Sequence, residues 1–322
     1  MNLHLTIKPF SFQLIQSLKT SQGILKGKNG WLLHLRDSDG HYGWGEVSPL
    51  NKSERALCSK ILTRISTTVS VQELEENLKK WPGALSFGMG SALAELQGLI
   101  GVNSNKIWLS APKSAILLAN NSSLLKTINF LATNHKATKH PLTLKLKIAI
   151  ESQSKEEILL AQILENLPEN VLLRLDANSG LKREEAEKWS EFFQKESRLE
   201  WLEQPLPTHD LEGHIRLSNK IPIALDESLL EQPSLRKSWK GWQIRRPLLE
   251  GDPRPLLKEL EQGASYRMIS TSFETGIGLR WINHLAALQQ QGPTPTAPGL
   301  APGWCPNSAL FSKNPEFVWQ AA

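Results

Sequence analysis

The fold is decided by three segments in which an apolar run leads directly to an acidic side chain: VLLRLDAN at 171–178, LEWLEQP at 199–205 and IPIALDES at 221–228. Each run is short enough to form a buried parallel strand. Asp176, Glu203 and Asp226 recur at the spacing of one strand, one helix and two loops, which is the repeat of a (β/α) barrel. We therefore expect three carboxylates at the carboxyl ends of three successive barrel strands.

Three carboxylates that converge on one dry cavity repel each other unless a cation holds them together. Carboxylate oxygens are hard ligands, which suit Mg²⁺ or Mn²⁺. The spacing of Asp176, Glu203 and Asp226 therefore predicts a metal site before any family is considered.

A pair of lysines lies upstream of these acids, in the segment Leu144–Ile148. Alternation along a strand places Lys145 and Lys147 on one face and the apolar side chains on the other. An exposed edge strand would explain this pattern, but a barrel strand is covered on both faces, where inward lysines are costly without a function. A lysine in such a site can have a lowered pKa and act as a base near neutral pH.

The pattern along the chain predicts two parts. Residues 1–108 are expected to form an α+β capping domain completed by the tail 303–322, and residues 109–302 a (β/α)7β TIM-like barrel that carries the site. In the capping domain we expect strands at Leu3–Phe12, Gly30–Leu35 and His41–Val47, and helices at Ser53–Val69, Val71–Trp81 and Gly90–Leu99. The expected barrel strands are Ala115–Leu118, Thr143–Ile148, Val171–Leu175, Leu199–Leu202, Ile221–Leu225, Gly241–Ile244, Tyr266–Ile269 and Thr294–Leu300, with helices such as Lys155–Leu167 and Lys182–Gln194 between them.

Composition limits the classes of partner. Among 322 residues, Lys and Arg exceed Asp and Glu by five, and there is no basic block interleaved with aromatic residues. A small anionic substrate is therefore a simpler interpretation than a nucleic acid. Cys58 and Cys305 show no metal-binding spacing, which suggests a reducing compartment. The sequence shows no leader and no apolar stretch of membrane-spanning length, so we expect a cytoplasmic protein without a membrane partner. The oligomeric state does not follow from the sequence.

The ordered set of Lys-x-Lys, Asp-x-Asn, Glu-Gln-Pro and Asp-Glu-Ser on consecutive predicted strands resembles the enolase superfamily, in its muconate-lactonizing subgroup. Within that subgroup it is most similar to the o-succinylbenzoate synthase family. Three further segments resemble signatures of this family, so the resemblance extends over nearly the whole chain: Gly43–Leu50, Ser86–Met89 with Ala92 and Leu93, and Ser270–Gly278.

The resemblance implies a role for each matching residue. Asp176, Glu203 and Asp226 would bind Mg²⁺ (or Mn²⁺), and Lys147 would be the general base, with Lys145 beside it to lower its pKa. Asn178 and Glu227 would orient these groups. Substrate contacts are expected from Ser270, Ser272 and the backbone near Gly299, and the loop Thr20–Lys26, with Lys26 as the candidate cation, would close the site.

The implied activity is a Mg²⁺-dependent dehydration of a small dicarboxylate in menaquinone or phylloquinone biosynthesis. It converts 2-succinyl-6-hydroxy-2,4-cyclohexadiene-1-carboxylate to 2-succinylbenzoate through proton abstraction by lysine and a metal-stabilised enediolate. How many other substrates are accepted does not follow from the sequence, because one fold can support many reactions.

One segment departs from the family pattern. Gln243–Pro247 carries Arg246 where the family has a second catalytic lysine, unless Arg245 is the inward residue. Arginine does not lose its proton in proteins, so it cannot be a base. A racemase or epimerase needs bases on both faces of the substrate, whereas a syn dehydration needs one, so the substitution favours dehydration. N-acylamino acid racemase or dipeptide epimerase activity, and a non-catalytic barrel that only binds, remain the alternatives.

Overall fold

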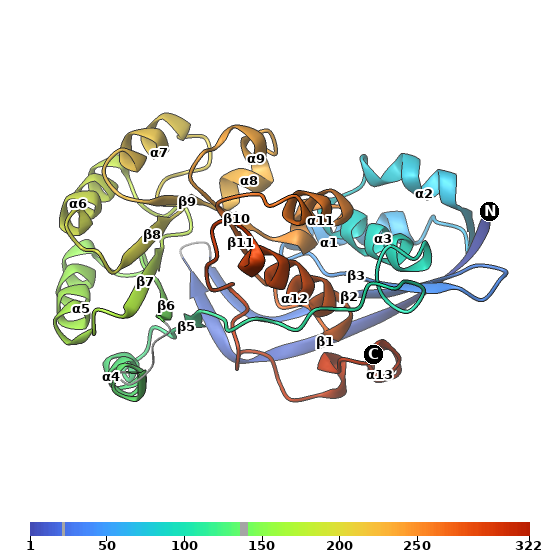
Figure 1. Ribbon diagram of the computed structural model, residues 1–322, viewed down its shortest axis with the longest axis horizontal. Helices are drawn as coiled ribbons and strands as arrows, with labels where there is room; N and C mark the ends of the chain where they lie inside the picture. Colours follow the sequence, from blue (N-terminus) through green and yellow to red (C-terminus); the bar gives the residue numbers. More distant parts are fainter. Residues whose placement is uncertain (21–22, 136–140) are drawn as a thin grey trace.

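The computed structural model describes residues 1–20, 23–135 and 141–322. It contains an antiparallel sheet with strand order β3-β2-β1-β4 and a parallel sheet with strand order β11-β10-β9-β8-β7-β6-β5. The parallel sheet is curled and its strands alternate with helices, while the antiparallel sheet lies to one side with helices α1–α3 (Figure 1). The predicted fold class, a TIM-like barrel with an α+β capping domain, is confirmed.

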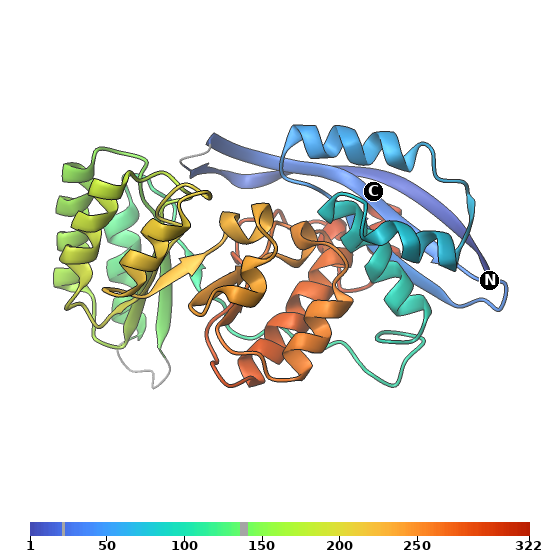
Figure 2. The ribbon, with the colours of Figure 1, turned by 90° about the horizontal axis from the view of Figure 1, so that it is seen from above.

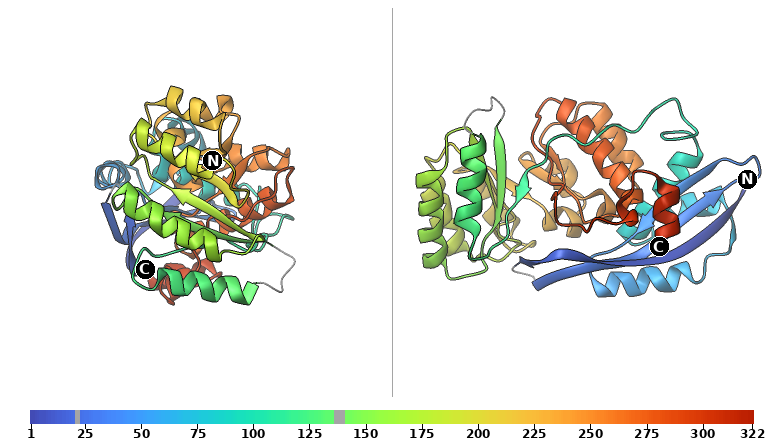
Figure 3. Two further views of the ribbon diagram at one scale, coloured as in Figure 1. Left: turned by 90° about the vertical axis from the view of Figure 1, so that its left-hand side faces the viewer. Right: turned by 90° about the horizontal axis from the view of Figure 1, so that it is seen from below.

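The capping elements follow one another from the N-terminus. They are β1 (Asn2–Thr20), β2 (Gly23–Arg36), β3 (Tyr42–Val47), α1 (Lys52–Leu62), β4 (Thr68–Ser70), α2 (Val71–Leu78) and α3 (Gly83–Leu96). Near the C-terminus, η1 (Ala309–Phe311) and α13 (Pro315–Ala321) return to this sheet (Figure 3). Lys8 donates a hydrogen bond to the Trp319 carbonyl at 2.8 Å, and the rings of Trp44 and Trp319 are in contact.

The barrel elements alternate as the sequence predicts. The strands are β5 (Ile116–Leu117), β6 (Leu142–Lys147), β7 (Val171–Asp176), β8 (Leu199–Glu203), β9 (Ile223–Leu225), β10 (Trp242–Arg245) and β11 (Arg267–Ile269). The helices are α4 (Leu124–His135), α5 (Gln153–Asn166), α6 (Arg183–Phe193), α7 (Leu211–Ser218), α8 (Glu227–Glu231), α9 (Leu235–Ser238), α10 (Pro247–Glu250), α11 (Arg254–Glu261) and α12 (Gly276–Gln291).

Strand β1 continues eight residues beyond the predicted end at Phe12, because its two halves bury opposite faces. Leu3 and Leu5 in the first half join the core around helices α1–α3. Phe10, Phe12, Leu14 and Leu18 in the second half pack against the C-terminal segment instead. Together β1 and β2 form a long pair of strands that reaches from the capping helices to the barrel (Figure 2). A single alternation rule cannot detect a strand whose buried face changes.

Two predictions for the capping domain are wrong in extent. The helix predicted at Ser53–Val69 ends at Leu62, and Thr68–Ser70 forms the edge strand β4 beside Asn2–His4. The helix predicted at Gly90–Leu99 begins at Gly83 instead. Glycines normally weaken a helix interior, but here the helix packs so closely against strand β3 that larger residues would not fit.

This close packing explains the glycines at positions 43 and 45. A Cβ atom on Gly45 would lie 2.0 Å from the Gly88 carbonyl oxygen, and one on Gly43 would lie 2.0 Å from the Ala92 carbonyl oxygen. Alternation places both glycines on the strand face that contacts α3. The capping core therefore depends on direct contact between the β3 and α3 backbones.

We expect Gly45→Ala to lower the free energy of unfolding by several kcal/mol, because the backbones of β3 and α3 must separate to admit a methyl group. Chemical denaturation followed by tryptophan fluorescence measures this change. The substitution Lys60→Ala, on the same capping domain but away from this contact, is the control. Equal stability of the Gly45→Ala and control variants would contradict the packing argument.

The barrel closes without a full eighth strand, so the strand predicted at Thr294–Leu300 is wrong in extent. Instead, Gly299 pairs with Ser270 as an isolated parallel bridge. The Pro298 carbonyl accepts a hydrogen bond from the Ala115 backbone at 2.9 Å. This short segment thus links β11 to the chain at the start of β5. Two prolines, at 295 and 298, remove backbone donors that a regular strand would need.

Side chains from alternate positions fill the barrel in layers. Trp201, Ala224, Ile244 and Met268 form an inner apolar cluster. The Arg174 guanidinium lies 4.0 Å from the centre of the Trp201 ring and binds Glu200 at 2.7 Å. The next inward positions along the strands lie at their carboxyl ends, where the predicted site residues are. Within the described ranges, no helix combines the length and apolar character needed to cross a bilayer.

The segment that connects the capping helices to the barrel is held by His284 on α12. The Nδ1 atom of this buried side chain accepts a hydrogen bond from the Leu109 backbone at 3.2 Å, which requires an unprotonated ring nitrogen. Burial lowers the pKa of His284 to about 4. Protonation would break this contact and leave a charge in an apolar setting.

This lowered pKa makes the stability depend on pH. Because the folded protein binds fewer protons at His284 than the unfolded chain does between about pH 6.5 and pH 4, the stabilisation is present above pH 6.5 and is lost as the pH falls. We expect His284→Gln, which keeps an acceptor but cannot titrate, to flatten the decline of unfolding free energy over this range. Urea unfolding at a series of pH values measures it, and an unchanged slope would contradict the assignment.

Candidate active site

The register of the parallel strands brings the predicted residues together. Lys147 is paired with Asp176, and Asp176 with Glu203, across β6, β7 and β8. Asp226 directly follows β9, and Arg246 directly follows β10. Because side chains alternate along each strand, these five residues point into the same end of the barrel.

The lysines bind the acids directly. The Lys147 Nζ lies 2.7 Å from Asp176 Oδ2, and the Lys145 Nζ lies 2.7 Å from the same oxygen and 2.6 Å from Glu203 Oε1. All four side chains are less than 10% exposed. Lys145 therefore bridges Asp176 and Glu203, while Lys147 contacts the same Asp176 oxygen and also Asn178 Oδ1 at 2.6 Å.

The structure separates the two neighbouring arginines. Arg246 points into the barrel, where its Nε lies 2.8 Å and 2.9 Å from the two Asp226 oxygens and its NH1 donates to the Thr271 carbonyl at 2.9 Å. Arg245 points outward and binds Glu250 and Glu259. Alternation across β10 thus makes Arg246 the inward cation.

The charges in this cluster shift the pKa values of its acids in opposite directions. Although burial favours a protonated carboxyl, Lys145 and Lys147 hold the pKa of Asp176 well below its usual range. Burial and the neighbouring Asp176 raise the pKa of Glu203. Burial and the adjacent Asp226 raise the pKa of Glu227 to about 7. Burial lowers the pKa of Lys145, but Asp176 and Glu203 outweigh it and raise this pKa overall.

Asn178 and Glu227 connect the lysine to the rest of the cluster. The Asn178 Nδ2 donates to Glu227 Oε1 at 2.9 Å, while its Oδ1 accepts from Lys147. The Asn178 backbone donates to Asp176 Oδ1 at 3.0 Å. The second carboxylate oxygen of Glu227 is buried and has no hydrogen-bond partner among the described residues. Both side chains are thus placed where they could orient Lys147 and the acids.

The cavity above the cluster is lined by two of the three predicted substrate contacts. Ser270 and Gly299 line it together with Lys145, Lys147 and Arg246. Apolar side chains complete the wall: Leu18, Ala115, Leu117, Phe273 and Ala301. Ser272 does not line this cavity. Its hydroxyl is buried without a hydrogen-bond partner in the described chain, and its carbonyl accepts from Lys28 at 2.6 Å.

The predicted closing loop is only partly described, because Ser21 and Gln22 lie outside the described residues. Lys26 is exposed and lines neither this cavity nor its neighbour. The neighbouring cavity shares Lys147 and Leu18 and is lined by Lys19, Asn120 and Asn121. Lys19 is therefore better placed than Lys26 to supply a cation from the capping strands.

Gln204 and Ser228 are positioning residues that sequence reasoning missed. The Gln204 Oε1 accepts hydrogen bonds from the backbones of Asp226 at 3.0 Å and Ser228 at 3.1 Å, and its Nε2 donates to the Ser228 hydroxyl at 2.7 Å. Gln204 itself has φ 38°, an unfavourable conformation that these bonds help to hold. The Glu-Gln-Pro and Asp-Glu-Ser motifs are thus tied together. In the sequence, only the position of these two motifs directly after predicted strands could have indicated this positioning role.

Glu250 is a second missed residue, on the outer side of strand β10. Its carboxylate accepts the Arg246 backbone N–H at 2.7 Å and binds the Arg245 guanidinium at 2.6 Å. The Arg245 and Glu250 side chains are about as buried as the lysine–carboxylate cluster of the barrel, at 5% and 6% exposure. Glu250 therefore fixes the strand end from which Arg246 enters the barrel.

We expect Glu250→Ala to cost about 3–5 kcal/mol of unfolding free energy, because it leaves the buried Arg245 charge with a weakened partner set. The exposed pair between Lys106 and Glu261 provides the control, since Glu261→Ala should cost at most about 1 kcal/mol. Urea denaturation of both variants measures the difference. Similar losses in the two variants would contradict the structural role of Glu250.

The donor set of the barrel cluster fits a hard divalent cation. Asp176, Glu203 and Asp226 offer carboxylate oxygens on three adjacent strands, and the unpartnered oxygen of Glu227 lies in the same acidic group. Burial first, and then the neighbouring carboxylates, raise the pKa values of Glu203 and Glu227. Added positive charge would favour the ionised form of both acids.

A second acidic group lies far from the barrel mouth, on the turn between β2 and β3. Asp37, Asp39 and His41 bring their ligand atoms within 4.8 Å of one another. Among the described residues, the barrel acids do not all lie this close together, since Lys145 and Arg246 bind their carboxylates. Asp37 already accepts the backbone N–H groups of Asp39 and His41, which accounts for this group as a turn.

Comparison with known proteins agrees with this capped barrel and its lysine–carboxylate cluster. Residues 136–238 match the family of enolase C-terminal domain-like proteins. The chain is 26% identical to an o-succinylbenzoate synthase of Thermosynechococcus vestitus over 289 residues, which cover 84% of this chain and 85% of the relative.

Solved structures share the fold of this chain. The crystal structure of o-succinylbenzoate synthase from Thermosynechococcus elongatus, complexed with Mg in the active site, superposes with a TM-score of 0.80, at 24% identity and over 99% of this chain and 100% of that one. The L-Ala-D/L-Glu epimerase of Bacillus subtilis gives a TM-score of 0.72, at 18% identity and over 95% and 91% of the two chains. The resemblance inferred from the motifs is thus confirmed.

Proposed function

We propose that this chain is a Mg²⁺-dependent o-succinylbenzoate synthase that dehydrates 2-succinyl-6-hydroxy-2,4-cyclohexadiene-1-carboxylate to 2-succinylbenzoate. One observation carries the proposal: Lys147 and Arg246 face one cavity from opposite sides of three carboxylates. This arrangement offers a lysine able to take a proton and, across from it, a permanent cation, while the second lysine of the cavity, Lys145, is paired with both Asp176 and Glu203. The reaction would belong to menaquinone or phylloquinone biosynthesis, in the cytoplasm, and the unpaired thiols of Cys58 and Cys305 agree with that compartment.

Lys147 is the group that would move the proton. Its Nζ lines the cavity and is held by Asp176 and Asn178, so its position is fixed by two hydrogen bonds. It would take the proton next to the substrate carboxylate and later return it to the departing hydroxyl on the same face. Loss of water leaves an aromatic ring, so the overall reaction is strongly downhill.

Asp176, Glu203 and Asp226 would hold the Mg²⁺ ion, which supplies Lewis-acid stabilisation of charge on the substrate carboxylate. The ammonium groups of Lys147 and Lys145 share Asp176 Oδ2, so one of the proposed metal ligands also positions the proposed base.

Arg246 would act by charge alone. Its guanidinium is anchored on Asp226 and the Thr271 carbonyl and reaches the cavity opposite Lys147. A fixed cation there stabilises the anion formed by proton removal and can stack on an unsaturated ring. Leu18, Leu117 and Phe273 provide the apolar wall for that ring.

The second carboxylate of the substrate would extend from this cavity toward Lys147 and Lys19, where the neighbouring cavity begins. Ser270 and the backbone at Gly299 line the opposite end. A dicarboxylate therefore fits the lining better than a neutral substrate, because the described residues that line the two cavities include Lys19, Lys145, Lys147 and Arg246 and no carboxylate.

The epimerase alternative shares the fold but requires two bases. Lys147 lines one side of the cavity as the proposed base. The other side carries Arg246, which keeps its proton and so cannot be a second base. A non-catalytic barrel is also disfavoured, because such a barrel would have no reason to bury Asp176, Glu203 and Asp226 together.

We expect the purified protein with Mg²⁺ to convert the cyclohexadiene substrate to 2-succinylbenzoate. Lys147→Ala should lower kcat by at least about 10³-fold, because the other lysine of the cavity, Lys145, is held by Asp176 and Glu203. Arg246→Lys keeps the cation but loses the guanidinium contacts to both Asp226 oxygens, so it should retain more activity than Arg246→Ala and less than the unmodified protein. Loss of substrate absorbance measures each protein.

Lys195→Ala, on the barrel surface, is the matched control and should leave kcat unchanged. Full activity of Lys147→Ala, or absence of conversion by the unmodified protein at saturating Mg²⁺, would overturn the proposal. If Arg246→Ala were as active as the unmodified protein, the electrostatic role of Arg246 would be wrong.

A further inference from the structure

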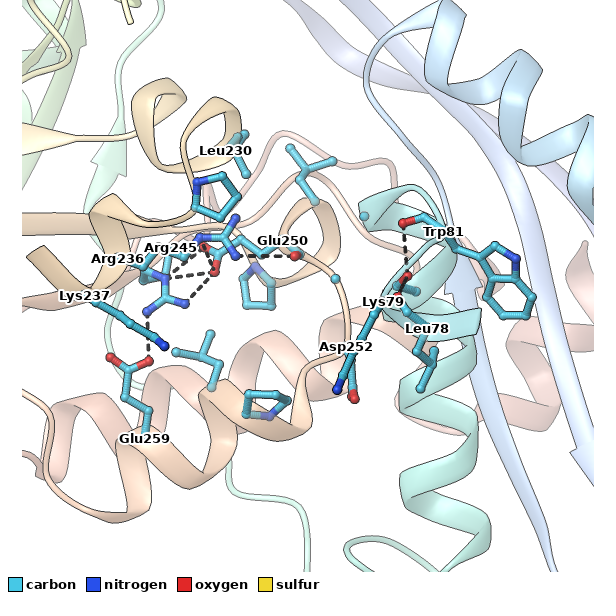
Figure 4. A pocket seen from close by; sticks show the side chains of 18 of the residues that line it. Leu78, Lys79, Trp81, Leu230, Arg236, Lys237, Arg245, Glu250, Asp252 and Glu259 are labelled. Carbon is cyan, nitrogen blue, oxygen red and sulfur yellow. Dashed lines mark hydrogen bonds and ion pairs between the residues drawn. The ribbon is translucent and has the colours of Figure 1, made fainter. Parts of the chain in front are cut away.

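A separate groove lies between the capping helices and the outer helices of the barrel. It encloses about 900 Å³ and is lined by α2 and α3 on one side and by α9, α10 and α11 on the other (Figure 4). The outward-facing Arg245 forms part of its floor, so strand β10 separates the groove from the catalytic cluster. Its volume is that of a typical small-molecule site, and such sites favour boundaries between packed units.

Every acid that lines this groove is already bound by an arginine. Glu250 binds Arg245 at 2.6 Å, and Glu259 binds Arg267 at 2.6 Å. The remaining two, Glu75 and Asp252, are each bound by Arg254 at 2.8 Å. Each carboxylate of the groove wall therefore already forms an ion pair within the protein.

Three further cations of the groove are less closely paired. The Arg236 guanidinium forms only a long ion pair, 3.6 Å, with Glu250, a carboxylate that Arg245 already binds at 2.6 Å. It otherwise donates to the carbonyls of Leu229 at 3.0 Å and Glu250 at 3.4 Å. Its side chain is 19% exposed, and burial lowers its pKa although the nearby Glu250 opposes this shift. Lys237 and Lys79 form no ion pair with any residue of the described ranges.

These cations surround the open space from both sides. Arg236 and Lys237 come from α9 on the barrel, while Lys79 follows α2 on the capping domain, and Figure 4 shows them on opposite walls. A ligand in the groove would therefore meet a planar guanidinium and two ammonium groups with no competing free carboxylate. The chemistry of the wall selects for negative charge.

We propose that this groove binds a small anion with two or more negative charges, recognised by Arg236, Lys237 and Lys79. The shared chemistry is that of polycarboxylates and phosphates. Such a ligand would join α9 of the barrel to α2 of the capping domain. By mass action, it would stabilise the docked arrangement of the two parts.

Calorimetry with two probes, citrate and pyrophosphate, tests the proposal on the full-length protein without Mg²⁺. We expect saturable one-site binding and an increase in Tm with probe concentration. Binding of citrate alone would assign a polycarboxylate, binding of pyrophosphate alone a phosphate compound, and binding of both a general polyanion site.

Variants locate the site. Lys237→Met and Lys79→Met, from opposite walls, should each weaken Kd about tenfold. Lys240→Met, a nearby exposed lysine that does not line the groove, should leave Kd unchanged. The two lysines are on the rim, so these variants remain informative even if Arg236→Met fails to fold. Absence of saturable binding for both probes, or equal Kd in Lys79→Met, Lys237→Met and the control, would overturn the proposal.

Discussion

Two lysine ammonium groups share the Asp176 carboxylate inside the barrel, at 2.7 Å each, and the rest of the site is arranged around this contact. Buried charges are tolerated only when partners surround them closely. Glu203 satisfies Lys145 on one side, and Asn178 satisfies Lys147 on the other. Arg246 forms an ion pair with Asp226. Three cations, Lys145, Lys147 and Arg246, thus face the four acids Asp176, Glu203, Asp226 and Glu227, an excess of carboxylate that a divalent cation could offset.

The capping domain matters because it completes the cavity from outside the barrel. Glu46, the acid of the Gly-Trp-Gly-Glu motif, accepts the backbone N–H groups of Thr275 at 2.9 Å and Gly278 at 3.1 Å, at the start of α12. Lys28 on β2 binds the Ser272 carbonyl in the loop after β11. These bonds fix the long β1 and β2 strands against the barrel, and Leu18 near the end of β1 then lines the cavity above the lysine–carboxylate cluster.

The sequence predicts those features whose cause is local. Barrel strands follow from short apolar runs, and the inward positions of Lys145, Lys147 and Asp176 follow from alternation. It could not decide between Arg245 and Arg246, because Pro247 ends the strand and leaves the parity open until neighbouring strands fix the register. The short closure at Gly299 was missed because one backbone bridge leaves no periodic pattern.

Other features depend on contacts between distant segments. The seven-residue error at the start of α3 arose because Gly88 and Gly90 suggest a helix break, while their purpose, close approach to Glu46 and Asp252, is visible only in three dimensions. Gln204 and Glu250 act through backbone groups of other elements, which no spacing rule describes. Positioning residues are thus harder to predict than the groups that they position.

The central claim is that the barrel carboxylates are arranged for one divalent cation. Titration of Mg²⁺ into the protein by calorimetry tests it most directly, with Glu203→Gln to remove a barrel ligand and Asp37→Asn to alter the acidic turn as a control. The account predicts one Mg²⁺ site per chain, lost in Glu203→Gln and unchanged in Asp37→Asn. Unchanged binding in Glu203→Gln, or loss of binding in Asp37→Asn, would contradict it.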